Sequence, residues 1–318
     1  MVLTIAATYI YTLLYPPPEN GRNLLKLEAP PETKDAIIAP DAVGGKTAVE
    51  VIDKVETGAQ AVPWFPKAIV LPKDVESTSA ALPAGLGDNR DEYHLIGLGV
   101  RTVSFFSIKV YVVGLYVASS DLAKLQAAFV KQAADVEAAS TLVPAEKDKL
   151  RGMLLDAEQS EKVWNDVLQT AHVRSVLRIV PTRDTDFAHL RDGWVRAVEA
   201  RANGSDKYVD PRDEKFGDSV GAFKAMFSGA GKPKVKKGMA ILLERDQAGL
   251  LRAWVQNNAS QNGFDQLGQM EDERIGRLIW LGYFGGKTVA SEVARESVID
   301  GIIEAVGRPV GTFETQVV

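Results

Sequence analysis

The order of strand and helix patterns along this sequence predicts an α+β fold. Residues 95–103 and 108–117 are rich in β-branched and aromatic residues, which is typical of two long strands. Helical patterns follow them and alternate with a further strand pattern. A hairpin pattern and two helical segments end the chain. The α+β class is compatible with this order, in which strands come first, helices are interleaved, and a hairpin with two helices comes last.

Composition limits the classes of function. The 318 residues, 46% hydrophobic and 25% charged, are enough for one large domain or two small ones with a sizeable core. A formal charge of -5 supplies no broad basic field, which argues against a nucleic-acid partner. The absence of cysteine excludes disulfides, thiolate metal sites and a cysteine nucleophile.

An uncharged apolar run begins at Val2 and ends at Tyr15. As a helix its fourteen residues would rise about 21 Å, against a hydrocarbon core of about 30 Å. Residues 1–15 are therefore expected to be part of a membrane anchor or an interfacial helix, with a buried terminal helix as the alternative.

Residues 16–88 carry ten of the fifteen prolines and are predicted to be a mostly extended linker. Trp64 and Phe65, which lie between two prolines, are a candidate docking point. The regular patterns begin after Asp88, so residues 89–318 are predicted to form the folded domain.

Within that domain the two long strands contain Gly97, Gly99 and Gly114, which predict bulges or close approaches of backbone. A helix is predicted over 120–136, and another over 145–169 with a break near Ser160. A strand is predicted over 174–180, ending at Pro181.

Later segments follow the same logic. Phe187, Leu190, Trp194 and Val198 are spaced three, four and four apart, which predicts one buried helical stripe. The remaining predictions are a helix over 218–227, a hairpin of 238–243 and 250–255 with Arg245 near its turn, and helices over 274–284 and 291–306, each followed by glycine.

Arg101 is the strongest lead on function, because it lies inside an otherwise apolar pair of strands. An arginine side chain keeps its charge, so an inward-facing one needs an anion, a carbonyl or a carboxylate. A structural ion pair with Asp186 or Asp192 is the alternative to a ligand contact.

The three histidines, His94, His172 and His189, have no paired spacing of the kind that binds zinc. No metal site is therefore predicted. A haem bound through one of them remains open, with a packed or exposed histidine as the plainer interpretation.

Several motifs occur in the order found in one known family: Val100-Arg101-Thr102, Val112-Val113-Gly114-Leu115-Tyr116, Val180-Pro181 and Gly286-Lys287. With them the chain resembles the chalcone isomerase family, and its longer strings resemble the fungal mitochondrial branch, the altered inheritance of mitochondria type. The resemblance implies a long antiparallel sheet with helices on one face and an apolar cleft between them. It also implies a mitochondrial location beside the inner membrane.

The resemblance further implies a set of ligand-binding positions. Arg101, with Thr102 beside it, falls on the family's substrate-binding arginine. Tyr111 falls on a threonine position, Phe187 on a tyrosine position, Trp194 on an asparagine position and Tyr283 on a substrate-selecting position.

The departures from the family pattern argue against chalcone cyclisation. Phe187 has no hydroxyl and Trp194 replaces a small amide by a bulky ring. Removing a hydrogen bond from a buried site typically costs about 1 to 3 kcal/mol. What remains is a cleft with aromatic walls and one cation. Such a cleft suits an amphiphile such as a fatty acid or haem, bound without catalysis.

Two other classes of function stay open. One is an intramolecular lyase of the chalcone isomerase type that acts on an unknown substrate through Arg101. The other is a membrane-tethered interaction module.

Overall fold

The structure is a computed structural model that describes residues 53–72, 90–103, 108–135, 139–204, 209–210, 212–228, 234–256 and 263–310. These residues belong to one compact unit of the chain, Ile52–Val318. The predicted apolar segment 1–15 lies outside the described residues. Among the helices that are described, none has the length and apolar character needed to cross a membrane.

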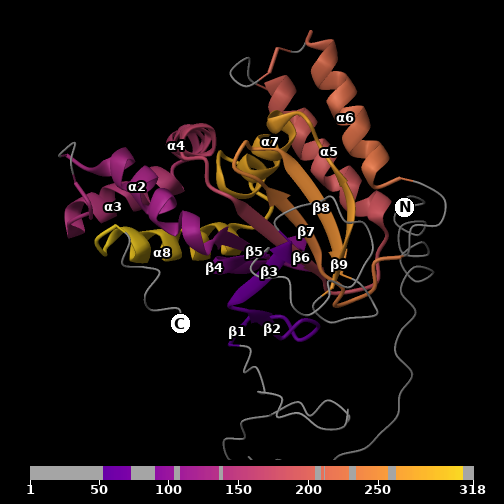
Figure 1. The fold of residues 1–318 in the computed structure, drawn as a ribbon, viewed down its shortest axis with the longest axis horizontal. Helices are drawn as coiled ribbons and strands as arrows, with labels where there is room; N and C mark the ends of the chain where they lie inside the picture. Colours follow the sequence, from indigo (N-terminus) through magenta and orange to yellow (C-terminus); the bar gives the residue numbers. More distant parts are fainter. Residues whose placement is uncertain are drawn as a thin grey trace, which may run out of the picture. The chain divides into compact units, whose positions relative to one another are not determined.

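Runs of strands and runs of helices follow one another along the described chain (Figure 1). The strands are β1 (Lys54–Glu56), β2 (Trp64–Pro66), β3 (Ala68–Pro72), β4 (Arg90–Val103), β5 (Ile108–Ala118), β6 (Ser175–Pro181), β7 (Ile241–Arg245), β8 (Leu251–Gln256) and β9 (Phe264–Gln269). The helices are η1 (Ser119–Asp121), α2 (Leu122–Ala133), α3 (Pro144–Leu155), α4 (Ala157–Thr170), α5 (Phe187–Gly204), α6 (Glu214–Met226), α7 (Glu273–Phe284) and α8 (Glu292–Val306).

A seven-stranded sheet in the order β3 to β9 is the centre of the fold. Every pair of neighbouring strands in it is antiparallel. The two longest strands, β4 and β5, pair in a register that sets Arg101 opposite Tyr111. This arrangement confirms the predicted α+β fold.

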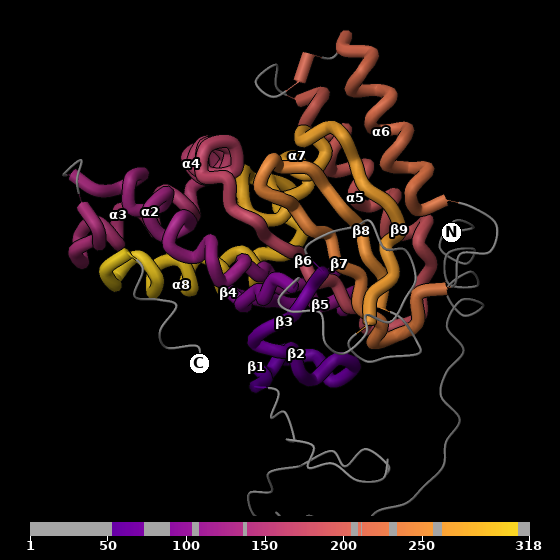
Figure 2. The backbone as a smooth tube through the Cα atoms, in the orientation of Figure 1, coloured from indigo at the N-terminus to yellow at the C-terminus, as the bar shows by residue number. Residues whose placement is uncertain are grey.

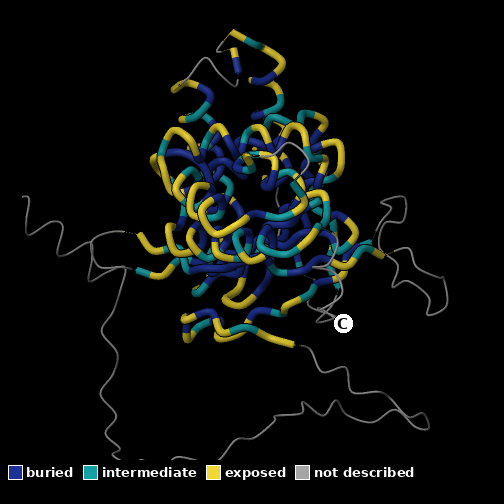
Figure 3. Tube along the Cα trace, turned by 90° about the vertical axis from the view of Figure 1, so that its left-hand side faces the viewer, coloured by how far each residue is buried: buried dark blue, intermediate teal, exposed yellow. Residues whose placement is uncertain are grey.

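Helices pack on one face of this sheet (Figure 2). Along β5, Tyr111, Val113, Leu115 and Val117 point to the helices, because side chains alternate in a strand. The opposite face packs against Phe65 of β2, and none of the described residues in its core is helical. Figure 3 shows the buried residues in the interior and the exposed ones on the outer turns.

Helix α8 lies directly on β4 because the strand presents glycines to it. A Cβ atom on Gly97 would lie 2.5 Å from the Ser297 carbonyl carbon, and one on Gly99 would lie 2.3 Å from the Ala294 nitrogen. A Cβ atom on Gly301 of α8 would lie 2.0 Å from the Ile96 carbonyl oxygen. The predicted close approach of backbone at Gly97 and Gly99 is therefore confirmed, and the sheet register also shifts between Leu95 and Gly97.

The predicted break within 145–169 was placed too late in the chain. Helix α3 ends at Leu155, and α4 begins after Asp156. The Asp156 side chain accepts hydrogen bonds from the backbone nitrogens of Glu158 and Gln159, so it caps α4. An N-cap aspartate was the better signal than Ser160, which is fully buried inside α4.

Three other elements differ from their predicted positions. Helix α6 begins at Glu214, before the predicted start at 218, because Asp213 caps it. Arg245 lies next to the hairpin turn, as predicted, but it is the last residue of β7, which extends beyond the predicted end at 243, and its side chain is buried. Strand β9 was not predicted because its residues are polar or partly exposed and give no clear alternation.

The segment predicted as linker contains β1, β2 and β3, and β3 adds an edge strand to the main sheet. Phe65 is fully buried there, while Trp64 stays half exposed. The C-terminal helices agree with prediction: α7 ends before Gly285 and α8 before Gly307.

Candidate ligand site

Arg101 reaches the helix-covered side of the sheet. It follows Gly97 and Gly99 along β4, and those glycines face α8. Across the strand pair it meets Tyr111, whose hydroxyl oxygen accepts a hydrogen bond from Arg101 Nη1 at 3.2 Å. The guanidinium carbon also lies 5.6 Å from the centre of the Tyr111 ring, within cation–π range. Arg101 is half-buried.

A chain of hydrogen bonds continues from Tyr111 into the helices. Its hydroxyl lies 2.8 Å from the hydroxyl of Tyr283 on α7. The indole nitrogen of Trp194 on α5 donates to the same Tyr283 hydroxyl at 3.1 Å. We call Arg101, Tyr111, Tyr283 and Trp194 the donor cluster. The fold thus brings together four of the six predicted ligand-binding residues.

Counting hydrogens shows what the donor cluster lacks. Arg101 donates to Tyr111, and Trp194 donates to Tyr283. The bond between the two hydroxyls uses one of their two hydrogens, so the other has no acceptor within the cluster. An incoming carboxylate or carbonyl oxygen would supply that acceptor.

Electrostatics keep the cluster in its donating form. Burial raises the pKa of Tyr283 well above its usual value, and the neighbouring Tyr111 adds to the increase. Burial alone would lower the pKa of Arg101, but the tyrosines beside it more than compensate and raise its pKa overall. At neutral pH the site therefore holds a cation and a neutral Tyr283 phenol.

A narrow slot between α5 and α7 opens at the donor cluster. Small residues line it, which leaves room beside Trp194 and Tyr283; they are Gly193, Ala197, Gly282 and Ala290, together with Ile279. We call this space the α5–α7 slot. It contains about 230 Å³ that no protein atom occupies, and the centre of a water molecule fits within about 20 Å³ of it. It therefore has room for about one water molecule.

Two predicted site residues lie elsewhere. Thr102 is exposed on β4, next to a shift in register, and does not line the slot. Phe187 is buried at the start of α5, where its ring packs 6.2 Å from that of Phe227. Neither side chain belongs to the donor cluster.

Trp194 has a polar role that was not predicted. In the sequence we interpreted it only as a bulky ring that replaces a small amide. Its Nε1 donates to Tyr283, so one donor persists at this position. The indole also packs 5.4 Å from the ring of Phe227, which fixes its orientation.

The alternative ion-pair partners of Arg101 are engaged with other groups. Asp186 accepts a hydrogen bond from the His189 backbone nitrogen, and Asp192 pairs with Arg191 at 2.7 Å. Within the described parts of the chain, no acidic residue forms an ion pair with Arg101. Among the described residues, its guanidinium instead donates a hydrogen bond to the Tyr111 hydroxyl.

The three histidines lie apart from the slot. His94 is buried on β4 with its Nε2 3.4 Å from Glu92, His172 is exposed near Gln247, and His189 is exposed on α5. None of them lines the α5–α7 slot. Over the residues that the structure describes, no three side chains of His, Asp or Glu gather as a metal site would require.

The small residues of the slot were not predicted from the sequence. Gly193 and Ala197 are four apart, so they share one face of α5, and Gly282 faces them from α7. A glycine and an alanine at this spacing next to Trp194 could have indicated a gap on that face.

Comparisons with known proteins match most of the chain. A family model described as "Chalcone isomerase like" matches residues 91–299. A Debaryomyces hansenii protein named "Altered inheritance of mitochondria protein 18, mitochondrial" is 31% identical over 225 residues, which cover 71% of each chain. A protein of the same name from Eremothecium gossypii is 31% identical over 252 residues, 76% of this chain and 77% of that one.

Two further matches extend the comparison. An uncharacterized Schizosaccharomyces pombe protein is 28% identical over 71% of this chain and 77% of its own length. Among solved structures, a fatty-acid binding protein of Arabidopsis thaliana aligns with a TM-score of 0.49 and 19% identity. That alignment covers 76% of this chain and all of the other.

Proposed function

The chain belongs to the chalcone isomerase like family, and from this premise we propose that it is a noncatalytic binder of a fatty acid, held through Arg101. The donor cluster is the observation that carries the proposal. It offers a cation and an unused hydroxyl hydrogen at the end of a slot lined by small apolar residues. A fatty acid has the complementary form, with two acceptor oxygens at one end of a hydrocarbon chain.

The proposed ligand places its carboxylate against Arg101 and Tyr111 and its chain along the α5–α7 slot. Because the free volume of the slot is small, we expect the bound chain to move α5 and α7 apart. A Cβ atom built on Gly193 meets no other atom within 4 Å, so there is open space beside this part of α5 for the ligand chain. Haem fits less well, because no histidine lines the slot to bind its iron.

The chemistry of the donor cluster favours binding over catalysis. Proton transfer requires a group that can accept the proton. None of the four side chains is a carboxylate or an imidazole, and burial keeps Tyr283 protonated. In an intramolecular lyase built on these four side chains, the substrate itself would have to supply the base.

We expect Arg101→Ala to weaken fatty-acid binding by about 10-fold to 100-fold, because a hydrogen bond to a charged group contributes about 1.5–3 kcal/mol. Tyr111→Phe, which removes one hydroxyl, should weaken it by about 2-fold to 10-fold. The measurement is displacement of a fluorescent fatty acid from purified protein, together with mass spectrometry of ligands extracted from wild type and variant.

Two exposed neighbours supply matched controls. Thr102→Ala changes the next residue of the same strand, and Lys109→Ala removes a positive charge from the strand paired with it. Both should bind like wild type. A wild-type protein that yields no extracted amphiphile and binds no fatty acid on titration would refute the proposal.

The same variants separate binding from catalysis. Wild type and Arg101→Ala are incubated with a set of chalcones and other conjugated enones, and product is followed by absorbance. We expect no product from either protein. Product from wild type that is absent with Arg101→Ala would instead favour the lyase.

We also propose a mitochondrial location, since the fungal relatives are named as mitochondrial proteins. Attachment to the inner membrane stays a prediction that depends on residues 1–15. Fractionation of mitochondria, with and without deletion of these residues, tests it.

A further inference from the structure

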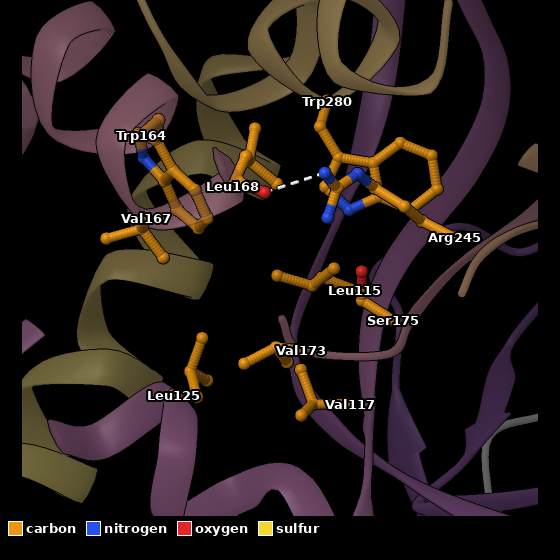
Figure 4. Close-up of a pocket in the computed structure, with 10 residues that line it drawn as sticks. All are labelled: Leu115, Val117, Leu125, Trp164, Val167, Leu168, Val173, Ser175, Arg245 and Trp280. Carbon is orange, nitrogen blue, oxygen red and sulfur yellow. Dashed lines mark hydrogen bonds between the residues drawn. The ribbon is translucent and has the colours of Figure 1, made fainter. Parts of the chain in front are cut away.

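A second pocket lies on the same face of the sheet and shares no lining residue with the α5–α7 slot. Strands β5 to β7 and helices α2, α4 and α7 supply the residues around it (Figure 4). Consecutive residues of α7 divide the two spaces, because Ile279 lines the slot while Trp280 lines the second pocket. We call the second space the Arg245 pocket.

Strand alternation brings Arg245 into this pocket. Ile241 and Leu243 of β7 point into the helix-covered core, and Arg245 follows them at the same spacing. Only 3% of its surface is exposed. A buried arginine stays charged at neutral pH and needs compensation from its surroundings.

The compensation that Arg245 receives is incomplete. Its Nη2 donates to the Leu168 carbonyl oxygen at 2.6 Å, while its Nε is buried and has no hydrogen-bond partner. Glu273 lies 4.0 Å away, but that carboxylate is one-third exposed and is hydrogen-bonded to Arg277.

A purely structural role accounts for only part of this arrangement. Leu168 lies in the last turn of α4, where carbonyl oxygens lack helical partners and a cation is favourable. That explains the single contact from Nη2. That role does not explain why Nε is unpaired or why a pocket adjoins the guanidinium.

Burial lowers the pKa of Arg245 to about 10, so its surroundings oppose the charge that it carries. An anion beside the guanidinium would reverse that balance.

The rest of the lining adds donors and hydrocarbon. The indole nitrogen of Trp280 is buried without a partner and Ser175 contributes a hydroxyl, whereas Trp164 turns the carbon edge of its ring toward the other lining residues (Figure 4). Leu115 and Leu125 are among the aliphatic residues that complete the wall. The unpaired polar atoms are all donors, so the complementary ligand brings acceptor oxygens on an apolar body.

We propose that the Arg245 pocket binds a short-chain monocarboxylate, with the carboxylate on Arg245 and the chain against Leu115 and Leu125. A single guanidinium matches a carboxylate through two parallel hydrogen bonds. The pocket has about 320 Å³ that no protein atom occupies, yet the centre of a water molecule fits within only about 20 Å³ of it. Residues of the hydrogen-bonded strands β5, β6 and β7 form one side of this pocket, so we expect it to widen less than the space between two helices and to take a short chain.

Tryptophan fluorescence tests the proposal, because Trp164 and Trp280 line the pocket and a bromine atom quenches an indole in contact with it. Purified full-length protein is titrated with 4-bromobutanoate. We expect saturable quenching in wild type and equally in Arg101→Met, which alters only the α5–α7 slot. In Arg245→Met, half-quenching should require at least ten times more probe.

Two further measurements keep the test independent of whether Arg245→Met folds. Neutral 4-bromobutanamide, titrated into wild type, should quench at least ten times more weakly than the carboxylate. Val167→Phe, which fills the pocket and leaves Arg245 in place, should weaken quenching by the carboxylate to a similar degree.

Several outcomes would overturn the proposal. They are the absence of saturable quenching in wild type, equal quenching by the amide and the carboxylate, and unchanged quenching in a folded Arg245→Met. Loss of quenching in Arg101→Met would also overturn it, because the probe would then bind at the first site. Failure of fatty-acid binding at Arg101 leaves these expectations unaltered.

Discussion

Gly301→Ala is expected to lower the free energy of unfolding by about 3 kcal/mol or more, whereas Gly221→Ala should raise it by about 0.5–1 kcal/mol. The two substitutions are the same change in the interior of a helix, in α8 and in α6 respectively. Replacing glycine by alanine in a helix normally stabilises it, because alanine loses less backbone entropy on folding.

The difference in sign comes from what surrounds each glycine. A Cβ atom on Gly221 meets nothing within 4 Å. A Cβ atom on Gly301 would lie 2.0 Å from the Ile96 carbonyl oxygen, a backbone atom of β4 that cannot rotate away. Helix α8 would have to move off the strand, and the close packing that Gly97 and Gly99 make possible would be disrupted.

Urea unfolding followed by circular dichroism measures both free energies. Gly99→Ala should behave like Gly301→Ala, because it acts on the same helix–strand packing from the strand side. If Gly301→Ala were as stable as wild type, α8 would not lie on β4 as described.

Raising the pH from 9 to 11 is expected to destabilise the fold by about 3–4 kcal/mol through buried tyrosines. Burial raises the pKa of Tyr93, Tyr116 and Tyr283, each well above its usual value. In the unfolded chain the pKa of the same hydroxyls is about 10. The stabilisation of the fold by these three buried phenols is therefore fully present below about pH 10 and is lost as the pH rises above that value.

The magnitude follows from proton binding. At pH 11 an unfolded tyrosine with a pKa of about 10 gains about 1.4 kcal/mol by ionising, and the folded one gains almost nothing. Three such residues give about 4 kcal/mol. Arg245 acts in the opposite direction, since its folded pKa of about 10 lies below the unfolded value. Above pH 10 the resulting stabilisation offsets at most the destabilisation that one tyrosine contributes.

Urea unfolding at pH 8, 9, 10 and 11 checks this prediction. Tyr116→Phe should reduce the loss between pH 9 and pH 11 by about a third, because it removes one of the three groups. Absorbance of phenolate near 295 nm should appear together with unfolding for these residues. A free energy of unfolding that is constant up to pH 11 would contradict the assignment of all three as buried phenols.

Much of the fold could be predicted because its signals are local. Strands β4 and β5, the buried stripe of α5 and the ends of α7 and α8 depend on side-chain periodicity and on glycines within a few residues of each other. The errors arose where the local signal was weak. Strand β9 is partly exposed and polar, and Asp156 was passed over as the start of α4.

The candidate site was predictable only in part. An arginine among apolar strand residues indicated Arg101, and the family pattern added Tyr111, Trp194 and Tyr283. Nothing in the sequence indicated that these side chains form one hydrogen-bonded chain, because Tyr111 and Tyr283 are 172 residues apart. The burial of Arg245 was likewise not predicted, because the hairpin pattern indicated only that it lies near the turn.

Three features follow from the sequence alone: the α+β class, the paired strands that carry Arg101, and the lack of any thiol chemistry. Periodicity and composition suffice for these, since each depends on neighbouring residues or on the mere presence of a residue type. Which groups meet the guanidinium groups of Arg101 and Arg245 depends instead on three-dimensional packing. Arg101 faces two phenols and Arg245 faces unfilled space, because the packing of α4, α5 and α7 on the sheet fixes those distances.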